Sequence, residues 1–180
     1  MFSFLLVSAT KFEHHDKDLF GHPIHIIGVG KVEAPINTYK LIQKYRPDHV
    51  INFGSCGNLK NHKIGEVLKI GTVYDDFHGC VVPEHEPIEV SYSPYGLFTT
   101  DTFYDTGSTY GKYYTEMTSK CDVVDMEGYS IAKVCRSQYV SVSLYKWVSD
   151  DGSSSDWEAN AAVGYDNFKA IFKQWLEQQK

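Results

Sequence analysis

The fold is decided by residues 28–59, which read GVGKVEAPINTYKLIQKYRPDHVINFGSCGNL. Apolar residues recur with helical spacing over residues 31–46, and Pro47 ends this pattern because it disfavours the α conformation of the residue before it. Strand-like apolar runs lie on either side of the helix, at Ile24–Val29 and at His49–Phe53. The order strand, helix, strand predicts two parallel strands joined by a right-handed crossover.

The alternation of strands and helices continues along the rest of the chain. An apolar run at Phe2–Val7 predicts a first strand, and the Pro-, His- and Gly-rich stretch Asp75–Tyr95 predicts a long loop. This order favours one α/β domain over residues 1–180, with three layers, α/β/α, around a mixed central sheet. Further strands are expected at Val67–Ile70, Thr72–Tyr74, Asp122–Val124 and Tyr139–Val148, and helices at Met126–Arg136 and Asp156–Gln178.

Composition excludes several classes of protein. With 23 acidic and 17 basic residues the formal net charge is −6, so the chain gains little from neutralising a phosphate backbone, and we expect no nucleic-acid partner. No apolar run approaches the roughly 18–20 residues of a membrane span, and we expect no membrane partner. The eight histidines lack metal-site spacing. The cysteines are far apart and predict free thiols in a reducing cytoplasm: Cys56, Cys80, Cys121 and Cys135.

Two glycine-containing turns follow predicted strands. Gly28–Gly30 lacks the third glycine of a dinucleotide-binding motif, because Glu33 occupies that position, and it is interpreted as a tight turn. The small residues of Gly54–Asn58 form either a plain turn or a cradle for a ligand at the carboxyl end of a strand. Ser55 does not lie in a GxSxG motif, because residue 53 is Phe, so a nucleophilic serine is poorly supported.

Acidic pairs follow two of the later strands. Asp125 and Glu127 flank Met126 where a strand turns into a helix, and Asp150 and Asp151 end another strand. If both strands are parallel neighbours of the strand before Gly54, the carboxylates converge on one crevice. They are otherwise helix N-terminal acids stabilised by the helix dipole.

Four stretches in this order resemble the nucleoside phosphorylase and nucleosidase superfamily, and most of all the methylthioadenosine/S-adenosylhomocysteine nucleosidases. Gly28–Leu59 is similar to the family's glycine-lysine helix, proline-aspartate strand and GSAGG-type loop. VVDMEGYSIAKVC at Val123–Cys135 is similar to its ribose-binding helix start, and WVSDDGS at Trp147–Ser153 to its ISD segment. TTDTFY at Thr99–Tyr104 resembles, more weakly, the segment that supplies a base-stacking aromatic residue.

The resemblance implies an enzyme that breaks the N-glycosidic bond of a purine nucleoside. Asp150 would be the general acid that protonates the purine N7, and Glu127 would accept hydrogen bonds from the ribose hydroxyls. Negative groups around the sugar would stabilise an oxocarbenium-like transition state. The other contacts implied are Met126 against the sugar, Phe103 stacked on the base, and Gly54, Ser55 and Gly57 on the side of the ribose where water or an anion sits.

The sequence departs from the family at three charged positions. Counted from Ala9, the family's water-activating glutamate falls on Phe12, and we nominate Glu13, one residue further, for that role. Asp125 replaces a glutamate with a shorter carboxylate. Lys146 replaces an arginine and loses its bidentate fork.

Either water or phosphate could attack the sugar. Arg46 and Arg136 lie at the ends of predicted helices, which leaves Lys146 as the candidate phosphate ligand. Hydrolysis with release of free base is therefore favoured over phosphate-dependent cleavage.

Two further hypotheses differ in class. The displaced glutamate is compatible with a degenerate family member that binds a nucleoside without turnover. An unrelated esterase using Ser55 is the least favoured. The resemblance implies a small-molecule nucleoside substrate, a homodimer, and no metal or organic cofactor.

Overall fold

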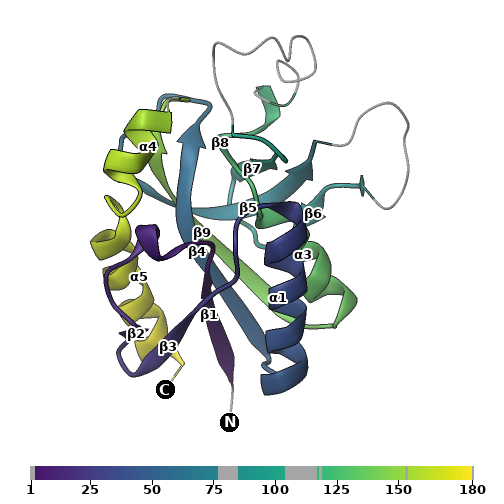
Figure 1. The fold of residues 1–180 in the computed structure, drawn as a ribbon. Helices are drawn as coiled ribbons and strands as arrows, with labels where there is room; N and C mark the ends of the chain where they lie inside the picture. Colours follow the sequence, from purple (N-terminus) through teal and green to yellow (C-terminus); the bar gives the residue numbers. More distant parts are fainter. Residues whose placement is uncertain (1–2, 77–84, 104–116, 118, 153, 180) are drawn as a thin grey trace.

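The computed structural model describes residues 3–76, 85–103, 117, 119–152 and 154–179. In these ranges helices lie on both faces of a nine-stranded sheet, which confirms the expected α/β fold with its mixed sheet and three layers (Figure 1). The strands are β1 Phe4–Ser8, β2 Asp18–Leu19, β3 His22–Ile26, β4 His49–Asn58, β5 Val67–Asp75, β6 Ile88–Glu89, β7 Tyr95–Thr99, β8 Val123–Asp125 and β9 Ser141–Asp150. The helices are η1 Lys11–Glu13, α1 Gly30–Tyr45, α3 Gly128–Ser137, α4 Ser154–Asn160 and α5 Tyr165–Gln178.

The sheet runs in the order β2-β3-β1-β4-β8-β7-β5-β6, and β9 pairs with both β4 and β5. β1, β3, β4 and β9 are parallel, as the crossover through α1 requires. The acidic pairs were expected to converge if both acid-bearing strands were parallel to β4, and only β9 meets that condition. β9 is parallel to β4, but β8 runs antiparallel to it, pairing Gly57 with Val124. The end of β8 reaches the same crevice from the opposite side of β4.

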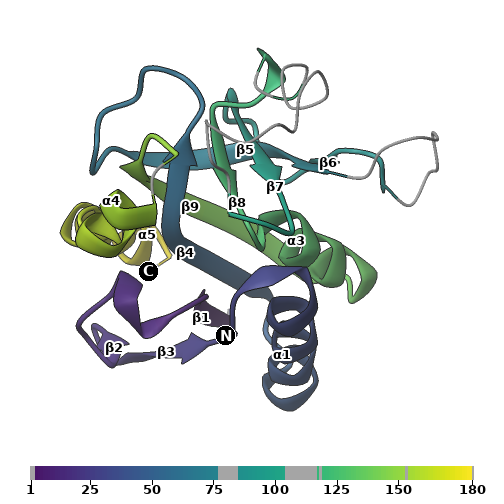
Figure 2. The ribbon, with the colours of Figure 1, turned by 45° about the horizontal axis from the view of Figure 1, so that its top comes forward.

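Side chains alternate between the two faces of the central strands, as the pleat demands. On one face Leu5 and Val7 of β1 pack against α1 and α3. On the other face Leu6 of β1 and Phe53 of β4 pack against the aromatic residues of α5, and Phe53 stacks on Phe168 with ring centroids 4.5 Å apart. Figure 2 shows α1 with α3 on one side of the sheet and α5 on the other. Each face therefore has its own core.

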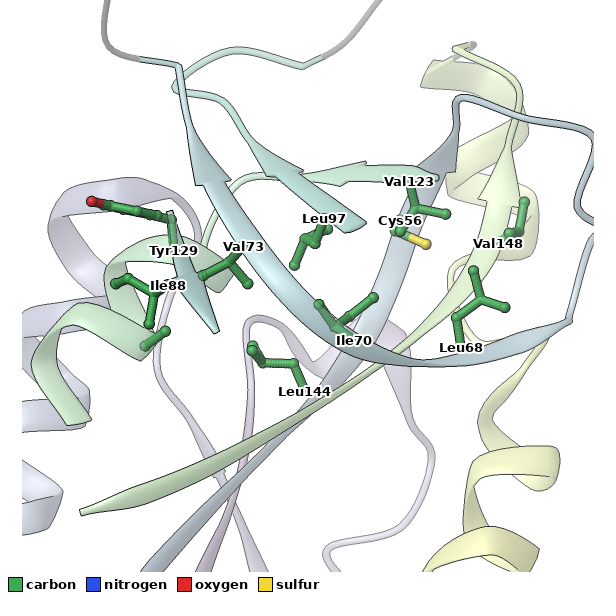
Figure 3. Packing of buried hydrophobic residues seen from close by; sticks show 11 residues of the cluster. Cys56, Leu68, Ile70, Val73, Ile88, Leu97, Val123, Tyr129, Leu144 and Val148 are labelled. Atoms are coloured by element: carbon green, nitrogen blue, oxygen red, sulfur yellow. The ribbon is translucent and has the colours of Figure 1, made fainter. Parts of the chain in front are cut away.

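A third apolar cluster fills the curl of the sheet between β5, β7 and α3 (Figure 3). Cys56 enters it from β4, and Val148 enters it from β9. Because both strands are anchored there, the backbone just beyond them is held in place. Ser55 and Gly57, on either side of Cys56, line the site described below, as does Asp150, two residues after Val148.

The structure corrects two predicted boundaries near the site. Gly54–Asn58, expected as a loop, continues β4, because its small residues pair with β9 and then with β8. The single helix expected over Asp156–Gln178 is two helices that are separated near Gly164. A Cβ at Gly164 would lie 2.2 Å from the Cβ of the buried Trp147, so the chain passes the sheet too closely there for any larger residue.

Some expectations are confirmed in the described ranges and others lie outside them. Of the four cysteines, Cys56, Cys121 and Cys135 are free and buried. β7 was not predicted, and β6 interrupts the expected loop over Asp75–Tyr95. No helix in the described ranges has the length and hydropathy needed to cross a bilayer. Phe2, residues 77–84 with Cys80, Tyr104 and Ser153 lie outside the described residues.

Candidate active site

A cavity of about 250 Å³ opens where β1, β4, β8 and β9 end. This is the edge of an α/β sheet at which ligands bind, because the carboxyl ends of the parallel strands meet there. It combines acidic groups with aromatic and aliphatic walls. Its lining consists of Ala9, Thr10, Glu13, Val29, Ser55, Cys56, Gly57, Thr100, Phe103, Val124, Asp125, Met126, Glu127, Asp150 and Trp157.

Glu13 reaches the cavity from the short turn η1, which follows β1. Thr10 caps this turn, and its backbone N–H donates to Glu13 Oε2 at 3.3 Å. The same oxygen accepts from Ser8 Oγ at 2.7 Å, while Oε1 accepts from the backbone N–H and the hydroxyl of Ser55 at 2.8 and 2.9 Å. Four donors therefore hold this buried carboxylate in one orientation.

The turn places Glu13, and not Phe12, at the cavity. Phe12 has 63% of its surface exposed, whereas Glu13 has 4% and lines the cavity. The close packing of Gly54 makes room for Glu13, because a Cβ at Gly54 would lie 2.5 Å from Glu13 Oε1. Gly54 therefore backs the carboxylate and is not itself part of the lining.

Asp150 ends β9 and is 2% exposed. Its Oδ1 accepts from the backbone N–H of Gly152 at 2.9 Å, and its Oδ2 lies 2.8 Å from Ser149 Oγ. Ser149 Oγ is also 3.1 Å from the carbonyl oxygen of Cys56. Because Ser149 can donate to that carbonyl, its oxygen can also accept a hydrogen bond from a protonated Asp150. Asp150 can therefore form hydrogen bonds with its neighbours both as a carboxylate and as a protonated carboxyl group.

Glu127 lies at the start of α3 and is 6% exposed. Its Oε1 accepts from the backbone N–H of Gly30 at 2.9 Å, which ties α3 to the start of α1. Burial, followed by the neighbouring Asp125 carboxylate, raises the pKa of Glu127 to about 8, and the charge of Lys146 only partly opposes this. Glu127 therefore changes charge close to neutral pH.

Lys146 does not face the cavity, contrary to the expectation of a phosphate ligand. It is 1% exposed, and its Nζ lies 2.8 Å from Asp125 Oδ2 beneath the floor. Burial alone would lower the pKa of Lys146, but the carboxylates of Asp125, Glu127 and Glu13 outweigh it and hold the pKa above its usual value. Lys146 is thus the buried counter-charge of the acidic groups.

Asp125 is fixed from several directions. Besides Lys146, it accepts from Thr99 Oγ1 at 2.7 Å and from the backbone N–H of Gly128 at 2.9 Å. The same carboxylate therefore caps α3 and neutralises Lys146. Asp125 also lines the cavity.

The walls come from elements far apart in the chain. Met126 and Phe103 both line the cavity, and Phe103 has 39% of its surface exposed. Trp157 of α4 closes a further part of the wall, and its Nε1 donates to Ser55 Oγ at 2.9 Å. Trp157 lies in the helix expected over Asp156–Gln178 and was not among the predicted site residues, because no local pattern marks it as facing a cavity.

Nucleophilic side chains are poorly placed for an esterase. The hydroxyl of Ser55 is engaged with Glu13 and Trp157, and no histidine occurs among the described lining residues. Burial raises the pKa of the Cys56 thiol well above its usual value. Within the described ranges no group of three potential ligands is placed to hold a metal ion.

The chain has relatives among known proteins. Residues 17–105 match the model of the phosphorylase superfamily. The 5′-methylthioadenosine/S-adenosylhomocysteine nucleosidase of Buchnera aphidicola subsp. Baizongia pistaciae is 30% identical over 179 residues, which cover 82% of this chain and 68% of the relative.

Solved structures share the fold. The futalosine hydrolase of Helicobacter pylori superposes with a TM-score of 0.82 at 17% identity, covering 98% of both chains. The 5′-methylthioadenosine/S-adenosylhomocysteine nucleosidase of the same species, with butyl-thio-DADMe-Immucillin-A, superposes with a TM-score of 0.79 at 19% identity, covering 97% of this chain and 99% of the other. The chain belongs to the phosphorylase superfamily, alongside the 5′-methylthioadenosine/S-adenosylhomocysteine nucleosidases.

Proposed function

We propose that this protein hydrolyses the N-glycosidic bond of a purine nucleoside of the methylthioadenosine/S-adenosylhomocysteine type and releases the free base. The observation that carries the proposal is the convergence of three buried carboxylates, Glu13, Glu127 and Asp150, on one cavity. They come from the ends of β1, β8 and β9, and the relatives that share the family are nucleosidases.

Asp150 is the proposed general acid. As the bond between C1′ and N9 breaks, its electron pair passes to the purine, and a proton from Asp150 to N7 neutralises the departing base. Ser149 supports this role, because its oxygen lies 2.8 Å from Asp150 Oδ2 and can accept a hydrogen bond from the protonated carboxyl.

Glu13 is the proposed base for the attacking water. The water oxygen forms the new bond to C1′, and Glu13 accepts one of its protons. The burial of Glu13 and its position beside Ser55 support this role. Glu127 is proposed to accept hydrogen bonds from the ribose hydroxyls, with Met126 against the sugar.

Phe103 is proposed to stack on the base, and its place in the lining supports this. Ser55 and Gly57 are proposed to border the water, with Gly54 behind them. Asp125 and Lys146 are proposed to support the ribose site from below, because they pair with each other beneath the floor.

Water is the proposed nucleophile because phosphate lacks a counter-charge in this cavity. Among the described lining residues there is no lysine or arginine. Lys146 is already paired with Asp125, and Arg46 and Arg136 lie at the ends of α1 and α3. Phosphate-dependent cleavage is the alternative that the assay below separates.

We also propose that the chain acts as a homodimer in the cytoplasm. An apolar stripe on α1, formed by Val32, Ile36 and Tyr39, is 45–66% exposed, and Val29 continues it to the cavity. Burying such a stripe against a second copy would be favourable. The free thiols of Cys56, Cys121 and Cys135 suit a reducing compartment. Sedimentation equilibrium tests the dimer, and a monomer at micromolar concentration would contradict it.

The function is tested by chromatographic detection of free base. The purified protein is incubated with methylthioadenosine, S-adenosylhomocysteine, adenosine and inosine, each with and without phosphate. Release without phosphate is expected, and Asp150→Asn should lower it at least about 100-fold. Release only with phosphate would make the enzyme a phosphorylase. Binding without release from any substrate would indicate a nucleoside-binding protein.

A further inference from the structure

Trp157 makes a polar contact that its place in the wall does not require. It is half-buried on α4, and its indole N–H donates to Ser55 Oγ on β4 at 2.9 Å. In the described part of the chain Trp157 belongs to none of the hydrophobic clusters that build the cores. Its contribution is therefore concentrated at the cavity.

The donors and acceptors of Trp157, Ser55 and Glu13 determine which group donates in each hydrogen bond. An indole nitrogen can only donate, whereas a serine hydroxyl has one proton and two lone pairs. With the indole N–H directed at Ser55 Oγ, the hydroxyl proton points to another acceptor, and Glu13 Oε1 lies 2.9 Å away. Trp157 thus commits Ser55 to act as a donor to Glu13.

We propose that Trp157 is a positioning residue for the carboxylate of Glu13, acting through the hydroxyl of Ser55. This inference rests on the proposed function, in which Glu13 activates water. Without the indole N–H, the Ser55 hydroxyl is free to rotate and to compete for the water that Glu13 must hold. The rate of the chemical step falls, while substrate binding through Phe103 and Glu127 is largely kept.

The test is a double-mutant cycle in the base-release assay with methylthioadenosine. Trp157→Phe keeps an aromatic wall and removes the donor, and Ser55→Ala removes the link. Each single variant should lower kcat about tenfold with KM changed less than threefold. The double variant should be no slower than Ser55→Ala, because both changes remove the same interaction.

A matched control removes an indole elsewhere. Trp175 lies on α5 in contact with Phe4 and Phe172, and Trp175→Phe should leave kcat within twofold of the wild type. Thermal unfolding confirms that each variant is folded. Trp157→Leu, whose side chain has no donor, repeats the comparison if Trp157→Phe does not fold.

The possible outcomes distinguish a failure of this inference from a failure of the proposed function. If the wild type releases base but the effects of Trp157→Phe and Ser55→Ala multiply, Trp157 does not act through Ser55 and the inference is overturned. A rise in KM with unchanged kcat would also overturn it, because Trp157 would then be a wall only. Failure of the wild type to release base from any substrate would overturn the proposed function and the inference together.

Discussion

Glu13 faces the cavity because the short helical turn η1, which follows β1, brings residue 13 rather than residue 12 to the buried side of the chain. The turn leaves Phe12 63% exposed and buries Glu13 among four donors. Glu13→Gln is expected to lower kcat at least about 100-fold, which is the ordinary contribution of a general base. Phe12→Ala should change kcat by less than about twofold. Steady-state base release measures both, and equal losses in the two variants would show that Glu13 is not the base.

Glu127 makes the stability of the fold depend on pH. Burial and Asp125 raise its pKa to about 8, whereas an unfolded glutamate titrates near 4.3. Between these values the folded chain holds a proton that the unfolded chain has lost, so this group lowers the free energy of unfolding as pH rises from about 4.5 to 8. Glu127→Gln removes that dependence.

Urea unfolding at pH 5 and pH 8 measures the effect. The stability of Glu127→Gln relative to the wild type should increase by at least about 1 kcal/mol between the two values, since one pKa unit corresponds to about 1.4 kcal/mol. Glu89→Gln, an exposed glutamate on β6, is the control and should show no such increase. Parallel pH profiles for the wild type and Glu127→Gln would contradict the raised pKa.

The sequence predicted which residues could belong to the site better than it predicted where their side chains point. Their place at strand and helix junctions made Asp150 and Glu127 candidates, the family resemblance implied their roles, and both line the cavity. Lys146 was the candidate ligand for a phosphate, should cleavage depend on phosphate, but its side chain pairs with Asp125 beneath the floor. A charge in a strand does not reveal which face it occupies until the partner strands are known.

Helices and strands were predicted correctly where the spacing of apolar residues determines them. They were missed or misplaced where contacts with other elements determine them. The crossover from β3 through α1 to β4 follows from apolar spacing and Pro47. The extension of β4 through Gly54–Asn58 depends on pairing with β9 and β8, which no local pattern contains. The break between α4 and α5 likewise depends on Trp147, a residue of another element.

A substitution at Gly164 tests whether close packing against Trp147 separates α4 from α5. Its φ is −95°, so its backbone suits any residue, but an added Cβ would lie 2.2 Å from Trp147 Cβ. Gly164→Ala should lower the free energy of unfolding by about 2 kcal/mol or more through overpacking. At Gly21, where φ is +85° and nothing lies within 4 Å of an added Cβ, alanine should cost about 1 kcal/mol. Urea unfolding that ranks the two variants the other way would contradict the clash.

The strand order of the sheet brings together site residues that are far apart in the sequence. Residues more than 130 positions apart, Glu13 and Asp150, meet because β1 and β9 are both parallel neighbours of β4. The cavity gathers four acidic side chains, with Lys146 buried below them. Such a charge balance favours a ligand that develops positive charge and disfavours a free anion.

This balance predicts which ligands stabilise the fold. Asp150→Asn is expected to bind methylthioadenosine without cleaving it, and at 100 times Kd bound ligand adds about 2.7 kcal/mol to the free energy of unfolding. For a chain of this size that corresponds to a rise in Tm of roughly 5–10 °C. Phosphate alone should shift Tm by less than about 1 °C, because the described lining contains no lysine or arginine. Differential scanning fluorimetry measures both. A phosphate shift as large as the nucleoside shift would mean that the cavity holds an anion, and the case for water as the nucleophile would fail.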